Sequence, residues 1–484
     1  MLFNSYIFIL FFLPVCILGY YILNHFRLYT FGQAFLIGMS LWFYGYFNIA
    51  YLGIIIFSVL VNFAVYQLLS RTEKEGTRRF VLGVGVCIDL GMLLYYKYMD
   101  FFIDSINKLF HRQYDLLEIL LPLGISFFTF QQISFIVDAY RKEVPAYPFL
   151  YYISFVTFFP QLVAGPIVTH DELIPQFLDE EKKRLDWDNL AKGIYLFIIG
   201  LSKKVLLADT FGNAVNWGYD NTQYLNTTEA ILVVLFYTIQ IYFDFSGYCD
   251  MAVGIGKMLN IDLPLNFDSP YKALTITEFW ERWHMTLTRF FTKYVYIPLG
   301  GNRKGAVRTY VNIMIVFLAS GFWHGAGVTF IIWGLCHGIF FAVTRRVKNF
   351  FDRLHPALNW MITFGFVNVA WVFFRADSLP QAIRILKLLV ASIFLPIDEA
   401  ITNYFRSPEI RFFISRTTIE DFNPHMVMMI YLIVAFVLIL GPKNAYEKML
   451  EFKPGVGKML FAAVLLAWCI FSFGGVSTFL YFNF

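Results

Sequence analysis

Runs of mostly apolar residues recur along the whole chain and are separated by short polar segments. A run of about 20 such residues is long enough for an α-helix to cross the hydrocarbon core of a membrane. The clearest predicted spans are residues 6–23, 31–47, 49–69, 80–98, 190–208, 230–247, 310–324, 328–344, 360–374, 426–440 and 459–473, with weaker or broken ones at 116–136 and 149–167. We therefore predict an all-α polytopic membrane protein of about 11–13 helices, allowing for uncertain helix ends.

Three segments do not fit simple spans. Residues 121–126 and 159–166 place proline and glycine in apolar surroundings, and such backbone is tolerated at membrane depth only where protein or water covers it. Residues 247–298 are long, aromatic and rich in Asp, Glu, Arg and Lys, which favours amphipathic and re-entrant helices. No internal repeat or low-complexity segment is present, so we expect one domain over residues 1–484.

Composition supports the membrane interpretation. The chain is 58% hydrophobic and 15% charged, against about 25% charged residues in an ordinary soluble domain. The net charge is +4 and its basic residues are scattered, so nothing indicates nucleic-acid binding. The five cysteines share no metal-ligand spacing, and we expect no metal site. The first span lacks the basic start and small-residue cleavage site of a signal peptide.

Basic loops predict the orientation. Lysine and arginine concentrate at residues 71–79, 303–308, 345–353 and 443–458, and such loops usually face the cytoplasm. All four basic loops can lie in the cytoplasm if Met1 is outside and the segment 247–298 begins on one side of the membrane and ends on the other. The C-terminus is then predicted to be extracytoplasmic.

Three histidines lie in apolar surroundings within 54 residues: His284, His324 and His337. Ionisable groups at membrane depth are costly and therefore functional candidates. A neutral imidazole can act as a general base toward a hydroxyl that attacks an acyl carbon. His324 could instead be a structural histidine that is hydrogen-bonded within the helical bundle, and for His337 a structural packing role is favoured. For His284 the alternative is ion pairing on a helix surface, because Glu278, Glu281 and Arg282 lie within two turns of it.

Acidic residues in or near the predicted spans allow a second class of protein, a transporter. Asp244 lies within residues 230–247; it could pair with a lysine or arginine, or orient a substrate or histidine in a polar tunnel. Asp89 lies within the span at residues 80–98. Because proton- or ion-coupled transport needs intramembrane acids, a transporter or flippase remains an alternative to an enzyme.

Four motifs together carry a resemblance to a known family. They are Tyr-Phe-Asp-Phe-Ser-Gly-Tyr at 242–248, the segment 266–287 ending in Glu-Arg-Trp-His-Met-Thr-Leu, Tyr-Ile-Pro-Leu-Gly-Gly-Asn-Arg at 296–303 and Gly-Phe-Trp-His-Gly at 321–325. The chain resembles the membrane-bound O-acyltransferase (MBOAT) family nearly end to end, and its bacterial alginate O-acetyltransferase branch in particular. The resemblance implies a ring of helices around a thin waist, where a cytoplasmic and an extracellular funnel meet.

The resemblance also implies roles for individual residues. It points to His324 as the catalytic histidine and to His284 as the second implicated one. We expect the neighbouring side chains to contact substrate, namely Asp244, Trp323, Trp283, Arg282 and His337.

The last six residues, 479–484, read Phe-Leu-Tyr-Phe-Asn-Phe. They resemble an aromatic FxYFxF tail of bacterial acyl-transfer systems, in which the tyrosine is proposed to carry the acyl group. A phenol is a possible nucleophile once a base removes its proton, so Tyr481 is a candidate catalytic residue. The alternative is an aromatic anchor at the membrane interface.

We therefore expect an enzyme of the bacterial cell membrane. It would move an acyl group, acetyl by preference, from a cytoplasmic donor to a cell-surface or exported polysaccharide. The donor would be acetyl-CoA or an acyl carrier-protein thioester, with no bound cofactor. Related systems imply an extracytoplasmic SGNH-like acetyltransferase as partner. A D-alanyl transferase acting on teichoic acid is the alternative within the same enzyme class.

Overall fold

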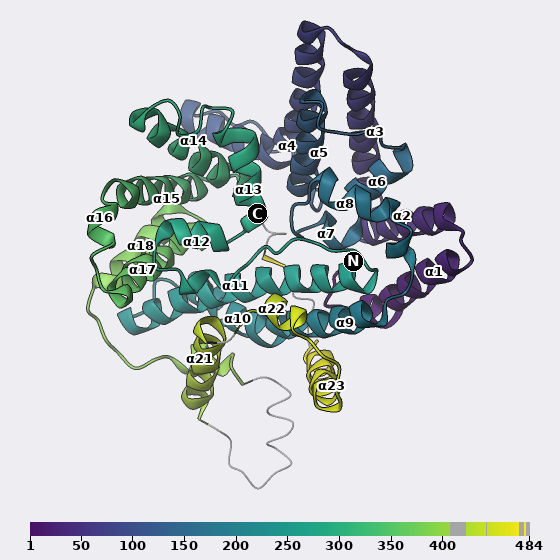
Figure 1. Cartoon of the computed structure of the whole chain (residues 1–484). Helices are drawn as coiled ribbons and strands as arrows, with labels where there is room; N and C mark the ends of the chain where they lie inside the picture. The colour runs from purple at the N-terminus through teal and green to yellow at the C-terminus, as the bar shows by residue number, and fades with distance from the viewer. Residues whose placement is uncertain (407–422, 442, 474–478, 481–484) are drawn as a thin grey trace. The chain divides into compact units, whose positions relative to one another are not determined.

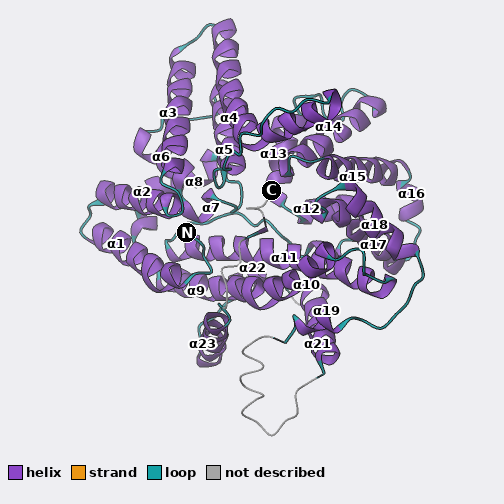
Figure 2. Ribbon diagram, turned by 180° about the vertical axis from the view of Figure 1, so that it is seen from behind, coloured by secondary structure: helices purple, strands orange, loops and turns teal. Residues whose placement is uncertain are grey.

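A computed structural model describes residues 1–406, 423–441, 443–473 and 479–480. Over these residues the secondary structure is helical, apart from a single β-bridge between Phe267 and Trp283. Figures 1 and 2 show the helices from opposite sides. The prediction of an all-α fold is confirmed.

The chain forms two compact units whose segments alternate along the sequence. Unit 1 comprises residues 1–197, 251–265 and 292–294, and unit 2 comprises residues 198–250, 266–291 and 295–484. Two helices, α9 (Trp187–Ser202) and α11 (Thr227–Met258), contribute residues to both units. The single-domain expectation stays a prediction.

Unit 1 contains the amino-terminal helices. They are η1 (Phe8–Phe12), α1 (Leu13–His25), α2 (Tyr29–Gly45), α3 (Ala50–Arg71), α4 (Glu75–Phe110), α5 (Ile125–Tyr140), α6 (Phe149–Thr157), α7 (Phe159–Leu162), α8 (His170–Leu178) and η2 (Glu181–Lys183). Helices α3 and α4 pack along each other, as both views show (Figures 1 and 2).

Unit 2 contains the remaining helices. They are η3 (Lys203–Ala208), α10 (Asp209–Asp220), η4 (Pro270–Lys272), α12 (Ile276–Arg282), α13 (Met285–Phe291), α14 (Ala306–His324), α15 (Val328–Arg346), α16 (Lys348–Phe351), α17 (Pro356–Arg375), α18 (Leu379–Val390), α19 (Glu399–Asn403), α21 (Pro424–Leu440), α22 (Ala445–Leu450) and α23 (Val456–Phe471). The short π-helix η5 (Thr292–Tyr296) begins in unit 1 and ends in unit 2.

Seven helices of the described residues are long and apolar enough to cross a membrane: Phe8–His25, Ala50–Arg71, Glu75–Phe110, Thr227–Met258, Ala306–His324, Val328–Arg346 and Pro356–Arg375. Two shorter apolar helices are Pro424–Leu440 and Val456–Phe471. The most apolar window of α4 is 17% buried and that of α11 is 83% buried. Helix α4 therefore presents most of its apolar surface outward, as a lipid-facing span does, whereas α11 is an interior helix. The chain is a multi-pass membrane protein.

The span predicted at residues 116–136 is wrong in its first half. Helix α5 begins only at Ile125, after Gly124, whose φ of 71° is left-handed. Residues 112–122 have no regular secondary structure, and the Asp100 carboxylate accepts the Leu117 and Ile119 backbone N–H groups at 2.7 and 3.2 Å. Pro122 has no backbone N–H to continue a helix, so a uniform apolar run becomes a loop followed by a helix.

The two irregular apolar segments of unit 1 meet each other. A Cβ atom on Gly124 would lie 2.5 Å from the Leu162 carbonyl oxygen, so only glycine permits this approach. The span predicted at 149–167 breaks at Phe158, and α7 starts with Pro160 in its first turn. Residues 159–166 are buried, and residues 121–126 are buried or half-buried, so protein covers most of this non-helical backbone.

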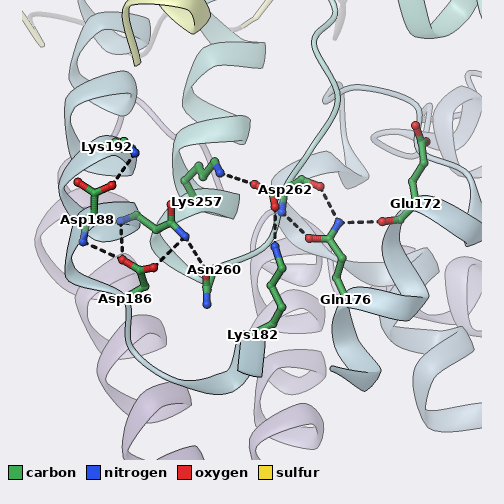
Figure 3. A network of polar contacts seen from close by, with 10 residues as sticks. Glu172, Gln176, Lys182, Asp186, Asp188, Lys192, Lys257, Asn260 and Asp262 are labelled. Atoms are coloured by element: carbon green, nitrogen blue, oxygen red, sulfur yellow. Dashed lines mark hydrogen bonds and ion pairs between the residues drawn. The ribbon is translucent and has the colours of Figure 1, made fainter. Parts of the chain in front are cut away.

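A polar network ties together the segments of unit 1 around residue 262 (Figure 3). The Asp262 backbone N–H donates to Gln176 Oε1 at 2.8 Å, and Gln176 Nε2 donates back to the Asp262 carbonyl at 2.9 Å. Lys182 and Lys257 both pair with the Asp262 carboxylate. The network fixes the chain after α11 against α8, just before the segment that enters the candidate site.

Candidate functional site

His324 is the last residue of α14, and its side chain is buried. Helices α14 and α15 approach closely because glycines face backbone. A Cβ atom on Gly321 would lie 2.4 Å from the Phe330 carbonyl oxygen, and one on Gly334 would lie 2.4 Å from the Phe317 carbonyl oxygen. Small residues allow such approach between membrane helices. The glycines of the motif around His324 therefore serve helix packing.

Two tryptophans connect the three histidines in unit 2. Ring centroids are 6.2 Å apart for His284 and Trp323, and 4.8 Å apart for Trp323 and His324. They are 5.2 Å apart for His324 and Trp333, and 4.8 Å apart for Trp333 and His337. The structure thus gathers all three histidines into one buried aromatic cluster, although they come from three different elements.

His284 has an unusual backbone. Its φ of 46° is left-handed, a conformation that costs a non-glycine residue about 1–3 kcal/mol and often marks functional sites. Surrounding hydrogen bonds hold it. The His284 carbonyl accepts the Leu287 and Thr288 N–H groups at 3.0 and 3.1 Å, and the Met285 N–H donates to the Asn266 carbonyl at 3.0 Å. The backbone of α13 and Asn266 thereby fixes the direction of the imidazole.

Asn266 determines which nitrogen of His284 carries the proton. Its side-chain oxygen accepts the Thr286 N–H at 3.2 Å and the Thr286 hydroxyl at 2.9 Å, and it lies 3.2 Å from His284 Nδ1. Its amide nitrogen donates to Cys249 Sγ at 3.3 Å, which fixes the orientation of the amide. Because an amide oxygen only accepts, Nδ1 of His284 is the donor and Nε2 carries the lone pair of the neutral ring.

Burial also keeps His284 neutral. The side chain is 1% exposed, and burial lowers its pKa from 6.5 to about 3. A neutral imidazole with a lone pair on Nε2 is the form that can accept a proton near neutral pH.

His337 has the opposite tautomer. The Trp280 Nε1–H donates to His337 Nδ1 at 3.3 Å, so the neutral ring carries its proton on Nε2. Nε2 is buried and has no hydrogen-bond partner among the residues that the structure describes. Since leaving such a donor unpaired costs about 1–3 kcal/mol, it is suited to meet an oxygen of a bound molecule.

Asp244 lies at the attachment point of the C-terminal tail. Its carboxylate pairs with Lys204 at 2.6 Å and accepts the Leu480 backbone N–H at 3.0 Å. The ion-pair interpretation of Asp244 is therefore correct, and its second contact is to the chain's own tail. A role for Asp244 toward substrate stays a prediction.

Phe479 is buried beside the histidine cluster. Its ring stacks on Tyr248 at 4.7 Å and meets Phe245 at 5.6 Å. Phe245 in turn meets His284 edge-on at 4.8 Å. One phenylalanine thus contacts both the tail and a site histidine. Tyr481 lies outside the described residues, two positions beyond Phe479.

Arg282 and Trp283 have structural partners. Arg282 pairs with Glu278 at 3.0 Å and with Asp268 at 3.3 Å. Trp283 stacks on Phe279 with ring centroids 5.6 Å apart. These contacts hold α12 in place beside His284, and a direct role of either residue toward substrate stays a prediction.

Sequence reasoning missed Asn266 and Phe245 as site residues. Both lie inside motifs that carried the family resemblance, but neither is ionisable, so a search for chemical groups passes over them. The described residues contain no group of three or more His, Cys, Asp or Glu side chains placed to hold a metal ion.

Comparison with known proteins agrees with this architecture. The model of the membrane-bound O-acyltransferase family matches residues 139–379, which include all three histidines. A peptidoglycan O-acetyltransferase of Helicobacter pylori is 43% identical over 420 residues, covering 81% of this chain and 80% of that protein. The chain belongs to the MBOAT family and is a membrane-bound O-acyltransferase.

Two further proteins are similar to this chain. A probable alginate O-acetylase, AlgI, of Pseudomonas aeruginosa is 35% identical over 463 residues, 94% of this chain and 84% of that protein. A teichoic acid D-alanyltransferase of Bacillus subtilis is 30% identical over 282 residues, 52% of this chain and 68% of that protein. Similarity to the two O-acetyl-transfer relatives is both higher and more extensive.

Proposed function

We propose that this enzyme transfers an acetyl group from a cytoplasmic thioester donor to a polysaccharide outside a bacterial cell membrane. The observation that carries the proposal is the cluster of His284, His324 and His337, which is buried in an O-acyltransferase. Two proteins named for O-acetyl transfer are similar to this enzyme over 81% and 94% of its chain. The D-alanyl alternative is supported by a match to about half of the chain, and a transporter has no support from the relatives.

His324 is the proposed general base. It accepts the proton of the attacking hydroxyl as the oxygen bonds to the acyl carbon, and returns a proton to the departing thiolate. The acyl carbon–sulfur bond breaks and an ester and a thiol result. General acid–base catalysis of this kind contributes about 10²–10⁴-fold to rate.

His284 and His337 are proposed to assist in different ways. The lone pair on His284 Nε2 can hold or orient the hydroxyl proton of the acceptor. The N–H of His337 Nε2 can donate to an oxygen that gains negative charge as the acyl carbon becomes tetrahedral, which is a strong effect in a dry site. Opposite tautomers on the two rings suit these two tasks.

Tyr481 is proposed to receive the acetyl group first and pass it to the acceptor. The burial of Phe479 against Tyr248 and Phe245, and the Leu480–Asp244 hydrogen bond, support a tail that is held next to the site. An extracytoplasmic SGNH-like acetyltransferase would then complete transfer to the glycan, as the family resemblance suggests.

Release of thiol tests the function. Purified enzyme in vesicles is supplied with acetyl-CoA and, separately, with a D-alanyl carrier-protein thioester. We expect thiol release from acetyl-CoA, and a loss of 10²-fold or more in His324→Ala, in line with removal of a general base. Release from the D-alanyl thioester alone would contradict acetyl transfer.

A further inference from the structure

A groove of about 520 Å³ runs along unit 2 between α21 and α23. Val434 and Leu438 of α21 line one wall, and Phe461, Leu465 and Trp468 of α23 line the other. These residues recur every three or four positions, so each wall is one face of a helix. Both helices are apolar. Figures 1 and 2 show them side by side, with α22 between one pair of their ends.

The α22 end of the groove is basic. Lys203, Lys443 and Lys448 line it. Lys203 pairs with Asp250 at 2.6 Å, and Lys443 pairs with Glu451. For Lys448 no carboxylate of the described residues lies within ion-pair distance.

The environment of Lys448 disfavours its charge. Burial lowers its pKa, and the positive charge of Lys203 lowers that pKa further. A negatively charged group between the two lysines would relieve this repulsion, because opposite charges favour the charged form of each amine.

We propose that the groove binds an anionic phospholipid, with its phosphate among the three lysines and an acyl chain along α21 and α23. A free anion would leave the apolar length of the groove unfilled, and a lipid with no net charge would leave the charge of Lys448 unbalanced. Basic pockets between transmembrane helices on the cytoplasmic side are typical sites for acidic headgroups. The predicted orientation places residues 443–458 on that side.

The site adjoins the machinery without being part of it. Tyr242 and Phe243 of α11 line the groove, and the next residue, Asp244, holds the tail through Leu480. A bound lipid would therefore support the helix to which the tail is attached. Lipid binding in this groove is separate from acyl transfer and does not depend on which donor or acceptor the enzyme uses.

Native mass spectrometry of the full-length protein tests the headgroup. Delipidated protein is incubated with phosphatidylglycerol or with phosphatidylethanolamine. We expect one phosphatidylglycerol to be retained, and Lys448→Gln to weaken retention about fivefold, the effect of one lysine near an acidic lipid. Lys453 follows α22 in the chain and does not line the groove, so Lys453→Gln removes an equal charge and should leave retention unchanged.

A second pair of variants tests the apolar wall. Leu465→Trp fills the groove and should abolish retention, whereas Val464→Trp places the same side chain on the neighbouring exposed position and should not. Equal retention of the two lipids, or retention that neither Lys448→Gln nor Leu465→Trp changes, would overturn the proposal. Displacement of phosphatidylglycerol by coenzyme A at equal concentration would also overturn it, because it would assign the groove to the donor.

Discussion

Asn266 and Trp280 give the site histidines different chemistry. The amide oxygen of Asn266 forces His284 to donate from Nδ1, while the indole N–H of Trp280 forces His337 to accept at Nδ1. The first ring is left with a lone pair on Nε2 and the second with a proton there. Two chemically identical side chains in one aromatic cluster are thereby prepared for opposite roles.

Asn266→Asp should change the pH dependence of activity. A carboxylate beside His284 favours the imidazolium form and raises the pKa by about 1–3 units, from about 3. Protonation then removes the lone pair at a higher pH than in the wild type. We expect the acidic limb of the pH–rate profile of the variant to lie higher by a similar amount, with kcat reduced at pH 5–6 and recovering toward pH 8.

Thr286→Val provides the control for this profile. It removes the hydroxyl that bonds the same amide oxygen but adds no charge. Because no charge is added beside His284, its pKa is not raised in this variant, and the pH–rate profile should keep the wild-type acidic limb. Superimposable profiles for wild type and Asn266→Asp would contradict the assigned role of Asn266.

The α14–α15 pair depends on glycine at its contact. Gly321→Ala would place a Cβ atom 2.4 Å from the Phe330 carbonyl oxygen, and backbone cannot yield as a side chain does. Overpacking of this kind costs about 1–3 kcal/mol, and it would displace His324 three residues later. We expect a lower Tm in detergent together with reduced activity. In Gly365→Ala, in α17, the added Cβ atom meets open space, so Tm and activity should be preserved. An equal loss in Gly321→Ala and Gly365→Ala would refute the packing argument.

The contact between the C-terminal tail and α11 gives a second prediction at the scale of the elements. Phe479→Ala removes the ring that stacks on Tyr248 and meets Phe245 edge-on. We expect acyl transfer to the acceptor to fall about tenfold or more, since burying a large aromatic ring is worth about 1.5–3 kcal/mol. Donor KM should be unchanged. Phe471→Ala removes a ring that is 75% exposed on α23 and should have little effect; equal losses would mean that the docked tail has no special role.

The hydrophobic pattern predicts helices far better than it predicts the site. Runs such as residues 310–324 and 328–344 agree with α14 and α15 because lipid-facing and buried helix faces are both apolar. The pattern failed at residues 116–124, where Pro122 and Gly124 override it. It could also not reveal Asn266, because the tautomer of His284 depends on contacts between segments that no local pattern encodes.

The orientation of the whole chain follows from its basic loops and can be measured. We expect a cysteine added after Phe484 to react with a membrane-impermeant maleimide in intact cells. Lys453→Cys, in a loop predicted to be cytoplasmic, should react only after permeabilisation. A cysteine-free background is needed because the five native cysteines are free among the described residues. The reverse labelling pattern would invert the predicted topology and place the tail on the donor side.

The proposed transfer needs an acetyl donor, a histidine base and a nucleophile on the tail, and one experiment tests all three. Purified enzyme is incubated with isotope-labelled acetyl-CoA and analysed by intact-mass and peptide mass spectrometry, beside His324→Ala and Tyr481→Phe. The predicted result is one labelled acetyl group on Tyr481 of the wild type and none on either variant. Acetyl transfer to the glycan acceptor without label on Tyr481, or label that persists in His324→Ala, would contradict the account.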